Sequence, residues 1–339
     1  MVQKQYIDTR SLTIIFLVSL IYGLIVKAGF VGFGIDYYAA YNKQNLEGTS
    51  IRDALGWKIS TLYIFDIYLG TFLVPFFISF TTGILLKHFF KIQLLNSSII
   101  FLLIFIMSIF SWPIVISSNN AMRQGLMMSA IFLGLVSLSN GKLILAIFYM
   151  TIASFTHKAG VGYMLNLLYV IGFILFLEKK VTINRSSFIF LGLIYFIVFY
   201  VVCMNVDRYG SRFETNVPIG KDFSLLFMLI NLFYILYFTT RIHLLKNYLF
   251  LFLYFFSFSC LAVFFAGLYW EFERYNMSLI TLYICTFSFG IKHNSKYIYF
   301  ITTLATLFIL TFLTGMYNHG GGVWSKELIY KDMITHSME

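Results

Sequence analysis

The chain has 339 residues, of which 60% are hydrophobic, 20% are aromatic and only 11% are charged. A soluble domain carries about 25% charged residues, so the composition excludes a water-soluble globular protein and is typical of a polytopic membrane protein. Most of the net charge of +10 falls in short polar segments between apolar runs. This placement fits membrane topology and anionic membrane lipid, so we expect no nucleic-acid partner.

The apolar runs predict an all-α fold of about eleven transmembrane helices that form a single domain over residues 1–339. The first run follows a short polar N-terminus without a small-residue cleavage site, so we interpret it as a retained span. The predicted spans cover residues 12–30, 61–86, 97–116, the two arms of 123–157, then 160–177, 187–206, 223–240, 247–268, 276–290 and 297–314. The predicted outer segments are 31–60, 207–222, 269–275 and the tail 315–339.

The first outer segment, 31–60, combines a possible acid–base residue with an amphipathic stretch. It begins with GFGIDYYAAY, in which Asp36 lies among aromatic residues and glycines. Its second half, TSIRDALGWKIS, predicts a short helix in the membrane interface, because Ser50 can cap it and Asp53 follows at the capping-box spacing. The apolar residues of this stretch fall on one stripe: Ile51, Leu55 and Ile59.

Pro113 stands near the end of the third predicted span. Proline interrupts the hydrogen-bond ladder of a helix, so we expect Ser117–Asn120 to turn irregularly at the membrane surface. Backbone N–H groups released there, ahead of the next helix, would be available to an anion.

The most informative stretch runs from Asn119 to Ala159 and predicts a helical hairpin. Arg123 opens the first apolar arm, the turn 139–142 joins the arms, and His157 and Lys158 close the second arm. The hairpin returns both polar ends to the same side of the membrane. Charged side chains inside or at the edge of a membrane span cost free energy, which favours a functional role for Arg123 and His157. The alternative is an arginine that snorkels to the surface and a histidine satisfied among lipid headgroups.

The distribution of basic residues favours a cytoplasmic N-terminus. With this orientation the inner segments hold half of the 24 Lys and Arg residues, but they are together only about half as long as the outer ones. They also contain only two acidic residues, Asp8 and Glu178. The outer side consequently has arginines that topology alone does not require.

These outer arginines predict a site for a lipid-borne phosphate or pyrophosphate, because a guanidinium group is permanently charged and forks onto phosphate oxygens. They are Arg123, Arg208, Arg212 and Arg274. Arg208 and Arg212 can instead pair with the neighbouring acids Asp207 and Glu214. The aromatic residues beside the arginines can stack on sugars or form the ordinary interfacial belt.

Several outer residues can accept a proton from a sugar hydroxyl: Asp36, Asp66, His157, Glu271 and Glu273. The pair Glu271-x-Glu273 is a weak signal for a divalent ion, and the adjacent Arg274 favours an ion pair. We therefore predict no metal and no cofactor. The cysteines fit no metal pattern and are interpreted as small packing residues: Cys203, Cys260 and Cys285.

Five short motifs, in this order, resemble the Wzy-type polysaccharide polymerases of the EpsG-like branch. They are GIDYYAAY, N-x-MRQGL, A-x-F-x-HK, RYGSRF and E-R-Y ahead of a span, and they cover about residues 30–290. The resemblance implies a GT-C-like fold in the bacterial inner membrane, with the active site on the periplasmic face. It implies a glycosyltransferase, metal-independent in our interpretation, that polymerises the repeat units of O-antigen, capsule or exopolysaccharide.

The implied substrate is an undecaprenyl-pyrophosphate-linked oligosaccharide, which serves as donor and acceptor. Membrane lipid is a second partner, and a chain-length regulator is a further candidate. The expected catalytic residues are Asp36, His157 and Arg123, with the base left open between Asp36 and His157. The expected pyrophosphate-binding residues are Arg123, Arg208, Arg212, Arg274 and Lys158. The alternatives are a transporter or flippase of lipid-linked oligosaccharide and an O-antigen ligase-like transferase.

Overall fold

The computed structural model describes residues 8–28, 67–92, 98–119, 122–157, 159–177, 184–206 and 221–268, with the single positions 272, 275, 276, 278, 279, 282 and 305. The described segments are helical and contain no strand. The helices are α1 (Thr9–Lys27), α3 (Ile67–Ile92), α4 (Ser98–Ile109), α5 (Trp112–Asn119), α6 (Met122–Ser139), α7 (Leu143–Thr156), α8 (Ala159–Leu177), α9 (Arg185–Val206), α10 (Lys221–Thr240), the 3₁₀ helix η3 (Ile242–Lys246) and α11 (Tyr248–Phe265).

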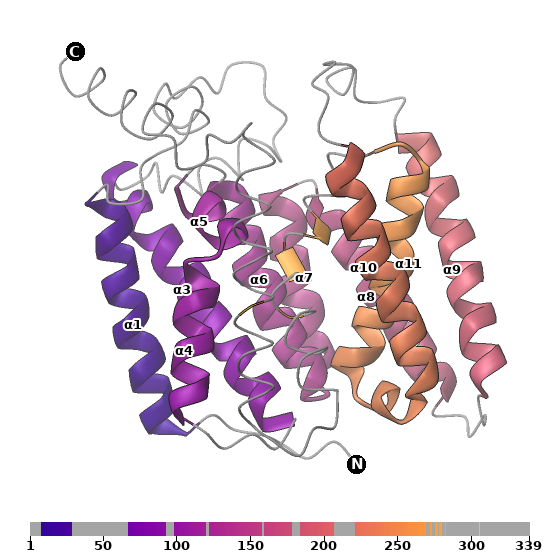
Figure 1. Cartoon of the computed structure of the whole chain (residues 1–339), viewed down its shortest axis with the longest axis horizontal. Helices are drawn as coiled ribbons and strands as arrows, with labels where there is room; N and C mark the ends of the chain where they lie inside the picture. The colour runs from indigo at the N-terminus through magenta and orange to yellow at the C-terminus, as the bar shows by residue number, and fades with distance from the viewer. Residues whose placement is uncertain are drawn as a thin grey trace.

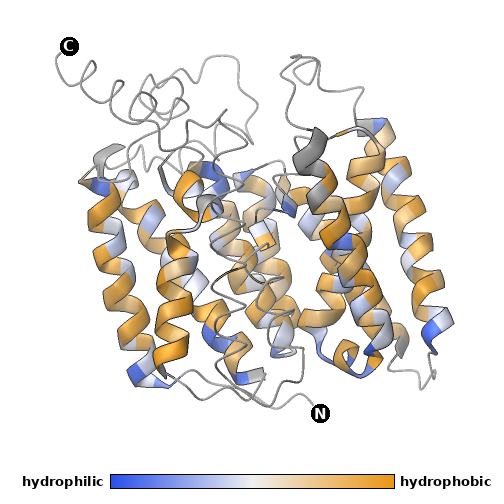
Figure 2. Cartoon of the chain, in the orientation of Figure 1, coloured by the Kyte–Doolittle hydropathy of each residue, from blue (hydrophilic) through white to orange (hydrophobic). Residues whose placement is uncertain are grey.

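The structure is that of a multi-pass, all-α membrane protein. Within the described part of the chain, six helices are long and apolar enough to cross a membrane: α1, α3, α6, α8, α9 and α11. Three shorter apolar helical stretches accompany them, in α4, α7 and α10. Hydrophobic residues predominate along the middle of the helices, and hydrophilic residues are more frequent toward the helix ends (Figure 2). The predicted interfacial helix and almost all of predicted spans 276–290 and 297–314 lie outside the described residues.

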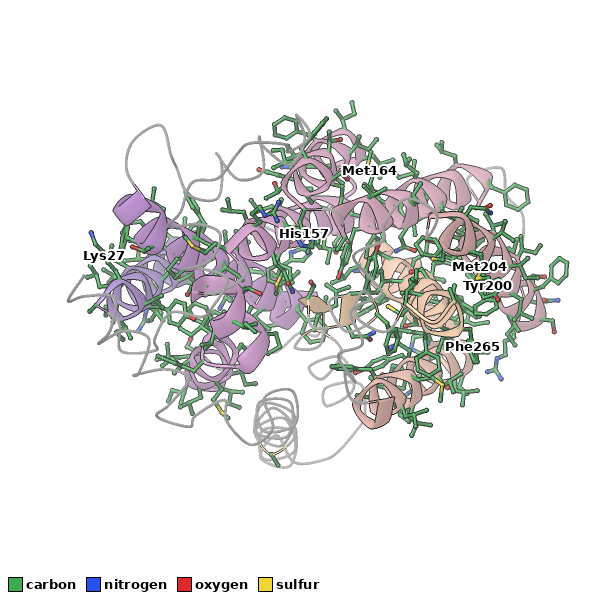
Figure 3. All side chains as sticks on the ribbon, turned by 90° about the horizontal axis from the view of Figure 1, so that it is seen from above. Lys27, His157, Met164, Tyr200, Met204 and Phe265 are labelled. Carbon is green, nitrogen blue, oxygen red and sulfur yellow. The ribbon has the colours of Figure 1, made fainter. Side chains whose placement is uncertain are left out.

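The helices run between two faces, which we call upper and lower as they stand in Figure 1. Viewed from above, the upper face includes Lys27 at the end of α1, His157 after α7 and Phe265 at the end of α11 (Figure 3). The lower face carries the α6–α7 turn and η3 (Figure 1). The predicted hairpin is confirmed: α6 and α7 pack along each other, and Gly141 in their turn has a φ of 73°, which glycine adopts without strain.

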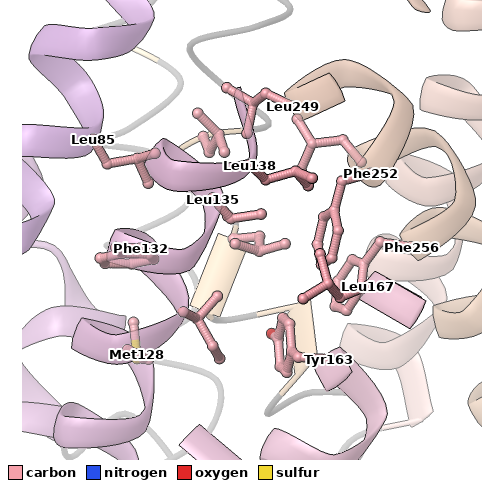
Figure 4. Packing of buried hydrophobic residues seen from close by; sticks show 14 of the residues in the cluster. Leu85, Met128, Phe132, Leu135, Leu138, Tyr163, Leu167, Leu249, Phe252 and Phe256 are labelled. Atoms are coloured by element: carbon pink, nitrogen blue, oxygen red, sulfur yellow. The ribbon is translucent and has the colours of Figure 1, made fainter. Parts of the chain in front are cut away.

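Of the described candidate spans, α6 and α11 are the most buried, whereas α1 and α9 lie at the two edges of the bundle (Figure 1). Residues 249–263 of α11 are all buried, in agreement with a helix that is apolar on every side. The side of α6 that carries Met128 and Leu135 shares a hydrophobic cluster with α8 and α11 (Figure 4). Cys203 and Cys260 are buried, which agrees with a packing role, and Cys285 lies outside the described residues.

The predicted end of the second span is wrong, because α3 continues through Lys87 and His88 to Ile92. No glycine or proline interrupts residues 84–92, so the helix has no local reason to stop at Leu86. Tertiary contacts accommodate the polar residues. His88 is only 2% exposed, and the Lys87 ammonium lies 5.1 Å from the centre of the Phe101 ring.

The expected irregular segment at Ser117–Asn120 is also wrong, because residues 117–119 are the last turn of α5. The break lies earlier, at Phe110 and Ser111, and Pro113 is the second residue of α5. A proline in the first turn of a helix leaves no intrahelical bond unmade, so here it starts a helix rather than ending one. The N–H groups of this last turn are consequently used within α5.

The lower end of α1 is capped by Asp8, whose carboxylate accepts hydrogen bonds from the Ser11 N–H and Ser11 hydroxyl, each at 2.8 Å. These bonds, with a smaller contribution from Lys87 at 3.9 Å, hold the pKa of Asp8 below its usual value. A depressed carboxyl pKa stabilises the fold above the unfolded pKa, and this stability disappears as pH falls through the folded pKa.

We therefore expect Asp8→Ala to destabilise the protein by about 1 kcal/mol at neutral pH, the usual cost of losing an N-cap. Thermal unfolding in detergent, followed from neutral to acidic pH, would measure this difference. The two proteins should converge at acidic pH, below the folded pKa of Asp8. A difference that persisted unchanged in acid would contradict this account of the cap.

Candidate functional site

The candidate site is the upper end of the α6–α7 hairpin, where the structure brings Arg123 and His157 to the same face. Arg123 is the second residue of α6 and is half-buried. His157 directly follows α7 and is also half-buried. In the view from above, His157 lies toward the middle of the bundle, between Lys27 on one side and Phe265 on the other (Figure 3). The predicted juxtaposition of the two ends is confirmed at the level of the helices.

A close backbone approach fixes the start of α6. A Cβ atom on Gly125 would lie 2.2 Å from the carbonyl oxygen of Ser117 in α5, so only glycine fits at this crossing. The Ser117 hydroxyl points to the sulfur of Met128 at 3.3 Å. The Ser118 hydroxyl lies 3.1 Å from the hydroxyl of Tyr22 in α1. Helix α5 thereby packs against the start of α6, which carries Arg123, and α1 is hydrogen-bonded to α5.

Gln124 is a candidate site residue that the sequence analysis did not single out. Its side chain is only 4% exposed, and its Nε2 finds no hydrogen-bond acceptor within the described part of the protein. Buried amides are nearly always hydrogen-bonded, and this makes Gln124 a candidate donor to a ligand oxygen. One signal in the sequence points to Gln124, which is a polar amide directly beside Arg123 at the start of a largely apolar helix.

The hydrogen bonds of His157 define the tautomer of its neutral imidazole. Its backbone N–H donates to the Ala153 carbonyl at 3.1 Å and closes α7. Its Nδ1 accepts a hydrogen bond from the Ala159 N–H at 3.2 Å. A neutral imidazole with an accepting Nδ1 carries its proton on Nε2. In this state Nε2 is a donor, which suits binding a phosphate oxygen better than removing a proton from a hydroxyl.

A close backbone contact between α7 and α8 connects His157 to α8. A Cβ on Gly160 would lie 2.2 Å from the Ala153 carbonyl oxygen, so α7 and α8 meet backbone to backbone. The Gly160 N–H also donates to the His157 carbonyl at 2.9 Å. The position of His157 is therefore fixed relative to the first turns of α8.

Those turns of α8 contact Tyr275, the last residue of the E-R-Y motif. The Tyr163 hydroxyl donates to the Tyr275 carbonyl at 2.7 Å, and the centres of the two rings are 5.3 Å apart. A Cβ on Gly162 would lie 1.9 Å from the Tyr275 hydroxyl, so glycine leaves room for this ring. The structure thus packs Tyr275 against α8, little more than one turn beyond His157.

The remaining predicted site residues lie outside the described residues: Asp36, Lys158, Arg208, Arg212 and Arg274. Their roles, and the absence of a metal and of a cofactor, stay predictions. The outer acids Asp66, Glu271 and Glu273 lie outside the described residues as well.

Comparisons with protein-family models, with curated proteins and with solved structures give no match for this chain. The resemblance therefore rests on the sequence motifs alone, and function has to be argued from the site.

Proposed function

We propose that this protein is a metal-independent glycosyltransferase of the Wzy type, EpsG-like branch. It joins undecaprenyl-pyrophosphate-linked oligosaccharide units at the periplasmic face of the bacterial inner membrane. The observation that carries the proposal is the return of Arg123 and His157 to one face of the hairpin, with Tyr275 packed nearby on α8. Eleven spans, a GT-C-like architecture and a cytoplasmic N-terminus belong to the same proposal.

The described lower face supports this orientation. It carries most of the described basic side chains, at helix ends and turns: Arg10, Lys87, Lys91, Lys142, Arg185, Arg241 and Lys246. Cytoplasmic loops are enriched in Lys and Arg, so the lower face is assigned to the cytoplasm and the upper face, with the site, to the outside.

In the proposed reaction, the bond between the donor's anomeric carbon and the pyrophosphate oxygen breaks, and the electron pair leaves with the pyrophosphate. The acceptor hydroxyl oxygen forms the new bond to that carbon and gives its proton to a base. Arg123, with Arg274 and the other outer arginines, stabilises the charge that grows on the leaving group. The Nε2–H tautomer of His157 favours Asp36 as the base and gives His157 a donor role toward the pyrophosphate.

The direct test is incubation of the purified protein with lipid-linked repeat units and no added metal, followed by gel analysis. A polymerase makes a ladder of products. A ligase-like transferase makes none until a different acceptor is supplied. Tight binding of the lipid-linked unit without any product, with or without magnesium, would replace the proposal with a transporter.

A specific observation keeps the transporter as the second candidate. Transporters place polar groups within the membrane, and Asn166, Asn231 and Asn276 are fully buried within the bundle. Asn166 donates to the Phe252 carbonyl and Asn231 donates to Asn276. Interhelical bonds of this kind stabilise helix packing, and for this reason we place the polymerase first.

Substitution of His157 separates a donor from a base. Glutamine can place an amide N–H near the position of Nε2, whereas asparagine is too short to do so. With a donor role, we expect His157→Gln to keep transfer within about tenfold of wild type and His157→Asn to lose about 100-fold. Steady-state transfer rates from pH 5.5 to 8.5 would measure both effects. Equal losses in the two variants, with a wild-type rate that rises through the histidine pKa range, would assign the base to His157 instead.

A further inference from the structure

Three helices hold Phe272, Tyr275 and Asn276. From α8, the Tyr163 hydroxyl donates to the Tyr275 carbonyl at 2.7 Å. From α10, the Asn231 side-chain amide donates to the Asn276 side-chain oxygen. We call this set of contacts the clamp.

Aromatic packing from α11 completes the clamp. The Phe272 ring lies 5.2 Å from Phe264, centre to centre. The Tyr275 ring lies 5.9 Å from Phe256, and the Tyr163 ring stacks on the same Phe256 at 4.7 Å. Phe272 and Asn276 are fully buried, and the Asn276 amide donates to the Phe272 carbonyl at 2.8 Å. Each of the three residues therefore has contacts that resist displacement.

Tyr163 of the clamp lies in the second turn of α8, which begins at Ala159, two residues after His157. Gly162 and Tyr163 are the fourth and fifth residues of α8, roughly 5 to 6 Å from its first residue along the helix axis. The α7–α8 junction at Gly160 and Ala153 fixes His157 relative to this helix. A rigid path of described contacts thus connects His157 to Tyr275, which is the last residue of the E-R-Y motif.

We propose that Tyr163 is a positioning residue, which sets the E-R-Y motif, and with it Arg274, at a fixed place relative to His157. This inference rests on the proposed function, in which Arg274 stabilises the leaving pyrophosphate. Tyr163 does not itself contact substrate and acts through Tyr275. A displacement of about 1 Å at a charge-stabilising group costs up to 100-fold in rate, so a modest loosening of the clamp is visible in turnover.

The test uses full-length Tyr163→Phe, which removes the hydroxyl and keeps the ring stacked on Phe256. We expect kcat for polymer elongation to fall about tenfold while the Kd of the lipid-linked donor changes less than about twofold. The matched control is Tyr254→Phe, which removes a fully buried hydroxyl from α11 whose ring contacts are Phe188, Phe238, Phe255 and Phe258. We expect wild-type kcat and Kd from this control.

A second readout does not depend on substrate. A nitroxide label attached to the Arg274→Cys variant reports local mobility, after subtraction of the signal from labelled protein that retains Arg274. We expect a more mobile spectrum with Tyr163→Phe and an unchanged spectrum with Tyr254→Phe. Gly162→Ala provides an independent variant, because its Cβ would collide with the Tyr275 hydroxyl, and it should shift both readouts in the same direction.

The outcomes distinguish this inference from the proposed function. An unchanged label spectrum in Tyr163→Phe overturns the clamp, and a mobile label with wild-type kcat overturns its role in positioning. A mobile label with reduced kcat supports the inference. Wild-type protein that makes no polymer from lipid-linked units overturns the proposed function and the positioning role together, while the label still decides whether Tyr163 restrains position 274.

Discussion

Replacing Arg123 with alanine is expected to slow polymer elongation by about 100- to 1,000-fold, the usual effect of removing one donor that stabilises a charged transition state. The physical reason is that the pyrophosphate gains negative charge as it leaves, at a membrane surface where a guanidinium is only partly solvated. Arg123 is half-buried at the start of α6, so the Arg123→Ala protein should still fold. The measurement is the rate of ladder formation by purified protein, with donor Kd and thermal stability measured in parallel.

Two variants make this prediction specific. Arg123→Lys keeps the charge but loses the two-pronged hydrogen bonding, so an intermediate loss of about tenfold is expected. Lys27→Ala removes an exposed basic side chain from the same upper face, at the end of α1, and should leave the rate unchanged. If Arg123 only snorkels to the surface, lysine would substitute fully and even alanine would retain normal polymer length.

Replacing Gly125 with alanine is expected to destabilise the fold by about 3 kcal/mol. The added Cβ would lie 2.2 Å from the Ser117 carbonyl oxygen and 3.1 Å from a methyl group of Val74. The first obstacle is backbone and cannot rotate away, so α5 and α6 have to separate. Separation moves the turn of α6 that carries Arg123, and transfer activity should fall together with stability.

The control for this substitution is Gly172→Ala in α8, where an added Cβ meets nothing within 4 Å. Alanine has the higher helix propensity, so this variant should be neutral or slightly more stable than wild type. Thermal unfolding in detergent, monitored by fluorescence-detected size-exclusion chromatography, compares the two directly. Equal melting temperatures for Gly125→Ala and Gly172→Ala would mean that the α5–α6 crossing is looser than the structure indicates.

The sequence alone was sufficient for the class of protein and for the helical hairpin that brings the ends carrying Arg123 and His157 to one side. Long apolar runs specify membrane helices because lipid leaves backbone polar groups no other partner. A short turn at Asn140 and Gly141 between two such runs returns their far ends to one side. These signals are local, so they predict the helices and the hairpin without knowledge of the neighbouring helices.

The two local errors show where such reasoning ends. Pro113 interrupts a helical pattern in the sequence, but whether a helix ends or begins there depends on where the backbone bends, and the bend lies at Phe110 and Ser111. Lys87 and His88 look like a turn because they are polar. The packing of Lys87 on Phe101 and the burial of His88 let the helix continue.

The finer features of the site were decided only by tertiary structure. The burial of Gln124 and the bond from Tyr163 to Tyr275 depend on which atoms surround each group. Tyr163 and Tyr275 are 112 residues apart, and nothing local marks them as partners. In a membrane the helices share one apolar character, so their arrangement is selected by close packing at glycines and by a few interhelical hydrogen bonds. Both depend on three-dimensional complementarity, which hydrophobic patterning along the chain does not encode.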